Sequence, residues 1–359
     1  MDRLLVVSNM YPSPQAPYFG VFVQRQVRAM RALGVDVTLA VSTERGGSAL
    51  GAARKYSRLG ADALREARRV KPQAILAHFV FPSGVIALSA GRAARAPVAL
   101  VAHGGDVDPS TGKPVWVRRA TRSVLGRVDL LLAVSRSIAE DARGAGADPE
   151  RIVVASMGYD ADAFVPRPQA DARTRVGIPP ERPVAVMVGN LIPRKGVGVI
   201  VEAAAALRSQ IPDLQWVLVG GGDQAPWRTQ AERAGSADVI RFAGTADPEE
   251  VPWWLAAADV AVVPSLREPF GVAAVEALAC GVPVVASRTG GLAEIMDGDH
   301  GLTVKPGDAD GLAEAVALIL SDGGLRARLA QAGPVAAAPH TADRQARATL
   351  DAIERIPPR

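Results

Sequence analysis

The sequence is poor in the residues that build disulfides and metal clusters. Among its 359 residues are one cysteine, Cys280, and four histidines. A single cysteine excludes a disulfide within the chain, and the histidines form no Cys/His cluster with the spacing of a metal site. We therefore expect a cytoplasmic protein that requires no metal ion and no other cofactor.

Long apolar runs are also missing. No stretch of 18 consecutive apolar residues occurs, so no membrane-spanning helix is expected. The apolar start of "MDRLLVVSNMYP" is too short, before Pro12, for the core of a signal peptide. With 48% hydrophobic and 22% charged residues, the composition is that of a soluble globular protein, and its length predicts two domains.

Charge is spread unevenly along the chain. Residues 1–165 carry 22 Lys and Arg against 14 Asp and Glu, a net charge of +8, whereas residues 166–359 carry 19 against 23, a net charge of −4. A basic first half favours contact with anionic partners such as phosphates, acidic lipid head groups or nucleic acid. Solvated arginines that only aid solubility explain the same charge equally well.

Short β-branched runs alternate with helical patterns, which is typical of βαβ units and parallel sheets. The strands expected in the first half are Leu4–Ser8, Val35–Val41, Ala74–Ala77, Val98–Ala102, Leu130–Val134 and Ile152–Ala155. Those expected in the second half are Val184–Gly189, Leu214–Gly220, Val239–Phe242, Val260–Pro264, Val282–Ala286 and Gly301–Val304. The predicted fold class is α/β, with two Rossmann-like, doubly wound domains.

The domain boundaries follow from the Pro- and Arg-rich segment "FVPRPQADARTRVGIPPERP". We expect a first domain over residues 1–165, a linker over 166–182 and a second domain over 183–338. Residues 339–359 form an amphipathic helix that either stays on the second domain or crosses back to the first.

In the first half, polar residues follow the predicted strands where ligands bind in open α/β sheets. In "VAHGGDVD", neutral His103 can donate a hydrogen bond to a ligand, or Asp106 stabilises a simple turn. His78 follows another strand, as a ligand contact or as a buried structural histidine. Gly20 begins a helix, and the absence of a side chain there suits either a phosphate or an ordinary helix start.

In the second half, "GNLIPRKGV" places Asn190, Arg194 and Lys195 between a strand and a helix. Cations at a helix start oppose the helix dipole. Either an anionic phosphate ligand balances them or the turn is exposed. The later "VGGGD" does not continue into dinucleotide-binding spacing, because Pro226 and Trp227 follow, and we interpret it as a tight turn.

The segment "REPFGVAAVEA" combines two carboxylates with a helix start. Glu268 lies in the loop, and Glu276 lies inside an otherwise apolar helix, where a lone carboxylate is costly to bury. Between them, the amides of Phe270, Gly271 and Val272 form a potential anion site. Hydroxyl-binding groups on both sides of a phosphate site suit a sugar nucleotide.

Taken together and in this order, these segments resemble the retaining family-four glycosyltransferases, which have the GT-B fold. The resemblance covers nearly the whole chain. It is carried by "FGVFVQRQVRAMRALGVDVTLA", "HGGD", "AVSRSIAEDARGAG", "GYDADAF", "GNLIPRKGV", "VGGGD", "IRFAG" and "VPSLREPFGVAAVEALACGVPVVASRTGGLAEI".

The resemblance implies a role for each matching residue. His103, Lys195 and Glu268 would be catalytic. The donor would contact Gly20, Asn190, Arg194, Lys195, Phe270, Gly271, Val272 and Glu276, with Glu276 holding the nucleotide ribose. His78 and Asp106 would contact the acceptor. Asn190 stands where family members often carry an arginine, so one diphosphate cation is missing unless Arg194 replaces it.

The function implied is transfer of a sugar, with retained configuration, from a nucleotide-diphosphate sugar to a carbohydrate or lipid-linked acceptor. Such reactions serve glycan, cell-envelope polysaccharide or glycolipid synthesis. The protein would be cytoplasmic, with peripheral contact to an anionic membrane through its basic first domain and no nucleic-acid partner. Two alternatives stay open: a sugar-nucleotide epimerase of the same fold, and a non-catalytic sugar-nucleotide-binding protein.

Overall fold

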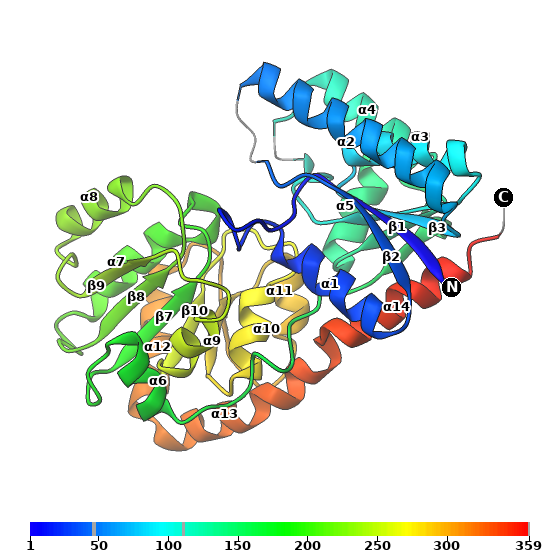
Figure 1. The fold of residues 1–359 in the computed structure, drawn as a ribbon. Coiled ribbons are helices and arrows are strands. Elements are labelled where there is room, and N and C mark those ends of the chain that lie inside the picture. Colours follow the sequence, from blue (N-terminus) through cyan, green and yellow to red (C-terminus); the bar gives the residue numbers. More distant parts are fainter. Residues whose placement is uncertain (45–47, 110–111, 358–359) are drawn as a thin grey trace. The chain divides into compact units, whose positions relative to one another are not determined.

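A computed structural model describes residues 1–44, 48–109 and 112–357 (Figure 1). The chain divides into two compact units. The first comprises Met1–Gly158 together with Thr341–Arg359, and the second comprises Tyr159–His340. Among the described residues, no helix is both long and apolar enough to cross a membrane.

The first unit contains a six-stranded parallel sheet in the order β2-β1-β3-β4-β5-β6. Its strands are β1 (Arg3–Ser8), β2 (Asp36–Val41), β3 (Ala74–His78), β4 (Val98–Ala102), β5 (Leu130–Ala133) and β6 (Ile152–Val154). Its helices are α1 (Val21–Ala32), α2 (Ala49–Val70), α3 (Ser83–Ala94), α4 (Val115–Leu125), α5 (Arg136–Ala145), the short η2 (Pro149–Arg151) and α14 (Ala342–Glu354). Every residue of β3 and β4 is buried, as central strands covered on both faces require.

The second unit contains another six-stranded parallel sheet, in the order β12-β11-β10-β7-β8-β9. Its strands are β7 (Val184–Val188), β8 (Gln215–Val219), β9 (Ile240–Gly244), β10 (Val260–Val263), β11 (Val284–Ser287) and β12 (Leu302–Val304). Its helices are α6 (Gln169–Val176), η3 (Pro193–Lys195), α7 (Val197–Leu207), α8 (Ala225–Ala234), α9 (Val251–Ala256), α10 (Val272–Ala279), α11 (Gly290–Ile295), α12 (Ala309–Ser321), α13 (Gly323–Ala337) and η4 (Ala338–His340). The twelve expected strands and the class of two doubly wound α/β units are confirmed.

The strand order of each sheet shows at which point of its edge a ligand is expected to bind. In a doubly wound sheet, ligands bind outside the carboxyl ends of the strands where the winding direction reverses. This reversal lies between β1 and β3 in the first sheet and between β7 and β10 in the second. The loops that follow these four strands are therefore the places to look for a site.

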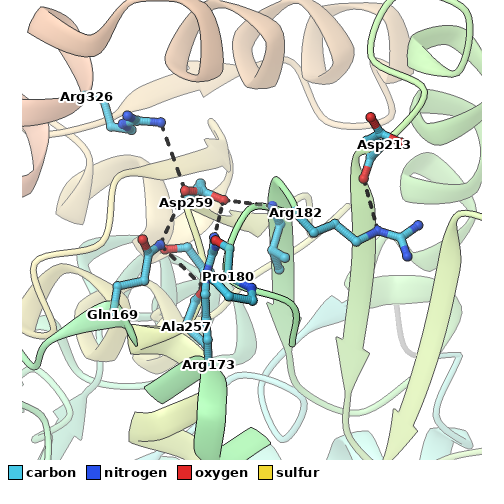
Figure 2. A network of polar contacts seen from close by, with 10 residues as sticks. Gln169, Arg173, Pro180, Arg182, Asp213, Ala257, Asp259 and Arg326 are labelled. Atoms are coloured by element: carbon cyan, nitrogen blue, oxygen red, sulfur yellow. Dashed lines mark hydrogen bonds and ion pairs between the residues drawn. The ribbon is translucent and has the colours of Figure 1, made fainter. Parts of the chain in front are cut away.

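The predicted linker over 166–182 is wrong as a separate segment, because its residues pack within the second unit. It contains α6, whose Arg173 is buried and pairs with Asp259, with Nη2 lying 2.8 Å from Oδ2 (Figure 2). Gln169 adds a hydrogen bond to the carbonyl of Ala258 at 3.0 Å. The prolines and arginines of this segment predict a solvated linker. Instead, Arg173 pairs with Asp259, a largely buried carboxylate of the second unit.

The last helix belongs to the first unit. α14 begins after Thr341, whose hydroxyl accepts a hydrogen bond from the amide of Arg344. It packs on α1, where the buried Gln26 donates to the hydroxyl of Thr349 at 3.2 Å. Of the two placements that the sequence left open, the chain adopts the return to the first unit.

Candidate functional site

Two histidines meet at the carboxyl edge of the first sheet. His78 is the last residue of β3, and His103 directly follows β4, its neighbour in the sheet. Nδ1 of His78 lies 3.0 Å from Nε2 of His103, and the rings stack at an interplanar angle of 17°. The sequence predicts both residues at strand ends, but their direct contact depends on the register between β3 and β4.

Two phenylalanine rings pack beside this histidine pair. The rings of Phe22 and Phe79 lie 4.8 and 4.6 Å from the ring of His103, centroid to centroid. Burial lowers the pKa of His78 to about 3, and burial together with His78 holds the pKa of His103 well below its ordinary value. Both imidazoles are therefore neutral at physiological pH.

The carboxylate of Asp106 forms hydrogen bonds to the backbone that follows β3 and to the backbone that follows β4. It accepts hydrogen bonds from the amides of Val80 at 3.0 Å, His103 at 3.1 Å and Gly104 at 2.9 Å. Burial raises the pKa of Asp106, although these hydrogen bonds act in the opposite direction. The turn interpretation of Asp106 is confirmed, and its contact with an acceptor stays a prediction.

Gly20 allows a close backbone approach beside the first sheet's crevice. It precedes α1 with φ of 79°, and a Cβ atom there would lie 2.8 Å from the carbonyl carbon of Met10. No side chain caps α1, so its first amides face no capping group of their own helix. The geometry requires glycine, and the expected phosphate contact stays a prediction.

In the second unit, Lys195 and Glu268 form an ion pair between the loops that follow β7 and β10. Nζ of Lys195 lies 2.6 Å from Oε2 of Glu268, which also accepts a hydrogen bond from Ser265 Oγ at 2.9 Å. Lys195 follows β7, whereas Ser265 and Glu268 follow β10. The loops that follow β7 and β10, the strands on either side of the reversal, thus supply the positive and the negative charge.

Backbone contacts fix the loops that carry this pair. The amide of Leu266 donates to the carbonyl of Arg194 at 2.9 Å, which joins the two loops. The amide of Gly291 donates to the carbonyl of Glu268 at 3.0 Å, so the start of α11 supports the second loop. Arg194 and Asn190 are exposed in the loop after β7.

The start of α10 follows the loop that carries Glu268. Gly271 precedes the helix with φ of 111°, and no side chain caps it. Ala274 and Val275 donate the first hydrogen bonds, to the carbonyl of Gly271. The amides of Val272 and Ala273 thus precede the hydrogen-bonded turns, in the arrangement that binds phosphate.

Two further predicted donor residues lie before and within α10. Phe270 is buried, and its ring contacts His340 edge to face, with centroids 5.5 Å apart. Glu276 lies within α10 and is only 7% exposed. Burial of the Cys280 thiol, together with the charge of Glu276, raises the pKa of Cys280 to about 12. The ribose contact of Glu276 stays a prediction.

The glycine turn after β8 has a packing role. Gly220 contacts the carbonyl of Gly189 so closely that a Cβ atom would overlap it. The indole Nε1 of Trp227 donates to the carbonyl of Leu191 at 3.1 Å, and the amide of Leu191 donates to Gly221 at 2.8 Å. The turn interpretation of "VGGGD" is confirmed, because these glycines hold the loop after β7 in place.

A cavity of about 470 Å³ lies against α4 and α5 of the first unit. Sequence reasoning missed it, because its walls come from separate elements without a common motif. Its charged lining includes Asp106, Lys113, Arg118, Arg119, Arg122 and Glu140. Among the described parts of the chain, no three His, Cys, Asp or Glu residues gather into a potential metal site.

Two doubly wound units with polar loops at their sheet reversals define a GT-B glycosyltransferase fold. HepE of Anabaena, solved with UDP and glucose, matches 98% of this chain and 99% of its own, with a TM-score of 0.79 and 22% identity. Sucrose-phosphate synthase of Thermosynechococcus elongatus matches 99% of both chains, with a TM-score of 0.82 and 22% identity. At this identity, the likeness shows the fold alone.

The family follows from the sequence matches. The family model "Glycosyltransferase Family 4" matches residues 19–163, and "Glycosyl transferases group 1" matches residues 168–335. The chain belongs to these family-four glycosyltransferases.

Sequence relatives agree with this assignment. D-inositol 3-phosphate glycosyltransferase 2 of Catenulispora acidiphila is 40% identical over 209 residues, which are 55% of this chain and 49% of the relative. The corresponding protein of Xylanimonas cellulosilytica is 34% identical over 260 residues, 69% of this chain and 61% of the relative. The matched segments therefore span about half to three fifths of these curated relatives.

Proposed function

We propose that this protein transfers a sugar from a nucleotide-diphosphate sugar to an acceptor hydroxyl and retains the anomeric configuration. The observation that carries the proposal is the Lys195–Glu268 ion pair beside the uncapped start of α10, at the sheet reversal of the second unit. A cation, free helix amides and a buried carboxylate together suit a ligand with both phosphate and hydroxyl groups.

In the proposed reaction, the bond between the anomeric carbon and the β-phosphate oxygen breaks, and a bond to the acceptor oxygen forms on the same face. The acceptor proton passes to the leaving diphosphate. Lys195 and the amides of Val272 and Ala273 stabilise the negative charge that develops on that diphosphate. Because this charge is larger in the transition state than in the bound donor, the contacts accelerate the reaction.

Glu268 would hold the transferred sugar through its hydroxyl groups. Lys195 and Ser265 both contact its Oε2, which orients the carboxylate and leaves Oε1 to accept hydrogen bonds from a ligand. Glu276, one to two turns into α10, would hold the ribose, and Gly20 would admit the diphosphate beside α1. His103 would lie near the anomeric carbon.

We place the acceptor on the first unit. The cavity beside α4 and α5 mixes cationic and anionic side chains, which suits a hydroxyl-rich acceptor, such as a carbohydrate or a lipid-linked sugar. The known relatives named above support transfer over epimerisation, because they are named as glycosyltransferases.

We also propose a cytoplasmic location with peripheral contact to an anionic membrane. On α4, Trp116 is 64% exposed and Val115 is 53% exposed, and the neighbouring Arg118 and Arg119 are exposed as well. An exposed aromatic ring beside arginines suits the interface of an acidic lipid bilayer.

The test is product analysis with the purified protein. We expect one of UDP-, GDP- or ADP-linked sugars to raise the melting temperature, since a ligand of the folded state stabilises it. With that donor and hydroxyl acceptors, proton NMR should show a glycoside with the donor's anomeric configuration. An epimerised sugar without a glycoside, or binding of a donor without any reaction, would replace the proposal by one of the two alternatives.

A further inference from the structure

The histidine pair of the first unit constrains the positions of its own protons. A neutral imidazole carries one N–H and one lone pair. The contact of 3.0 Å between Nδ1 of His78 and Nε2 of His103 has hydrogen-bond length. It therefore requires an N–H on one of these two nitrogens and a lone pair on the other.

This requirement couples the two tautomers. If His78 donates from Nδ1, then Nε2 of His103 accepts, and the proton of His103 lies on Nδ1. If His103 donates from Nε2, then Nδ1 of His78 accepts, and the proton of His78 lies on Nε2. In either case both rings have the same tautomer.

The two remaining nitrogens complete the argument. Nε2 of His78 and Nδ1 of His103 are buried and have no hydrogen-bond partner among the described residues. Because the rings share one tautomer, one of these nitrogens always carries an N–H and the other always carries a lone pair. The proton position of one ring therefore sets the proton position of the other.

We propose that His78 is a positioning residue that couples the tautomer of His103 to its own, and that this contact holds the His103 ring in one orientation beside the proposed sugar site. The second half of this statement rests on the proposed glycosyl transfer; the coupling of the tautomers does not. His78 itself is 1% exposed, so it acts through His103.

The surroundings hold the geometry that this coupling needs. Asp106 binds the amides of Val80 and His103, which fixes the two strand ends relative to each other. Phe22 and Phe79 pack on the ring of His103. Neither ring can turn without loss of the hydrogen bond or of this packing.

The test is nitrogen NMR of protein labelled with [15N]histidine. Nitrogens with and without a proton have distinct shifts, and the chain has only four histidines, so single variants assign each ring. In the wild type we expect the same tautomer at His78 and His103. Opposite tautomers, or a protonated imidazolium at neutral pH, would overturn the proposal.

Two variants separate positioning from packing. His78→Leu fills the space but removes the hydrogen bond, so His103 should become a mixture of tautomers. His78→Asn offers an amide that can either donate or accept, so it can keep a hydrogen bond to Nε2 of His103 without selecting a tautomer. Unchanged nitrogen shifts of His103 in a folded His78→Leu protein would overturn the proposal, and if that variant does not fold, the wild-type tautomers still decide.

Kinetics add the functional readout. We expect His78→Leu to lower kcat about tenfold with little change in the KM for the donor, and His78→Asn to recover most of the loss. A purely structural role would lower the melting temperature and leave the kcat of the folded protein unchanged. If the wild type transfers no sugar, the proposed function fails, while the NMR result still tests the coupling.

Discussion

The ammonium group of Lys195 lies 2.6 Å from the carboxylate of Glu268. The two residues are 73 positions apart in the sequence, and they meet because β7 and β10 are neighbours at the reversal of the second sheet. A cation and a carboxylate thus lie at one point, in the loops after these two strands.

Removal of the Glu268 charge tests its role in catalysis. Glu268→Gln keeps the size of the side chain but weakens its hydrogen bonds to sugar hydroxyls. We expect kcat/KM for transfer to fall by about 10²- to 10³-fold, measured with the donor that the thermal-shift screen identifies. Glu249→Gln, at an exposed position of the same unit, should leave kcat/KM unchanged. Equal activities of the two variants would remove Glu268 from the mechanism.

The backbone at Gly271 allows a prediction for stability and binding together. Its φ of 111° strains any other residue, and a Cβ atom would lie 2.8 Å from Leu292 Cδ1. Gly271→Ala should therefore lower the free energy of unfolding by about 2–3 kcal/mol and weaken donor binding, as seen in urea denaturation and calorimetry.

The matched control for Gly271 is Gly177. It also has a positive φ, of 67°, but no atom outside its immediate chain neighbours lies within 4 Å of the position that a Cβ atom would take there. Gly177→Ala should cost only about 1 kcal/mol and leave donor affinity intact. A comparable loss of affinity in both variants would show that the start of α10 does not bind the donor.

The ion pair between Arg173 and Asp259 tests the corrected boundary of the second unit. Both side chains are largely buried, with 6% and 14% exposure. Arg173→Ala removes the nearer of the two arginines at this carboxylate, since Arg326 lies 4.0 Å away. We expect a loss of about 3 kcal/mol in the free energy of unfolding. Arg208→Ala, which breaks the exposed pair with Asp238, should cost less than about 1 kcal/mol. Equal costs would mean that residues 166–182 act as a free linker.

The neutral histidines predict a loss of stability as the pH falls from 7 to 5. Burial lowers the pKa of His78 from 6.5 to about 3, so below pH 6.5 the unfolded chain binds a proton there that the folded chain does not. The cost from His78 is absent above its unfolded pKa and reaches about 2 kcal/mol at pH 5. His103 acts in the same direction.

Urea denaturation at pH 7 and pH 5 measures this loss. The drop in unfolding free energy should be smaller in His78→Asn than in the wild type. Asp106, whose pKa burial raises, acts in the opposite direction as the pH falls, and it is common to both proteins. An identical drop in both proteins would show that His78 titrates normally.

The proposed membrane contact predicts salt-sensitive binding to acidic lipid. Sedimentation with phosphatidylglycerol vesicles should exceed sedimentation with phosphatidylcholine vesicles, and the difference should shrink at high salt. The combined variant Trp116→Ser, Arg118→Ser and Arg119→Ser should reduce binding to the acidic vesicles severalfold. Equal binding to both lipids, or none, would contradict this contact.

Much of the fold follows from the sequence, because its strands are short β-branched runs and its strand ends carry polar residues. The sequence also places Glu276 within an apolar helix, and the structure buries it there. The course of residues 166–182 was not predictable, since nothing near Arg173 shows that Asp259 needs a partner. The histidine contact was also missed, because it depends on the register of β3 against β4 rather than on any local pattern.

Calorimetric titration of the donor tests the central claim most directly. The claim is that Lys195 and the start of α10 bind the diphosphate of a nucleotide sugar. We predict that the wild type binds one of UDP-, GDP- or ADP-glucose and that Lys195→Met raises the Kd at least about tenfold, the loss of one charge-assisted contact. Wild-type affinity in Lys195→Met, or no binding of any nucleotide sugar by the wild type, would contradict the account.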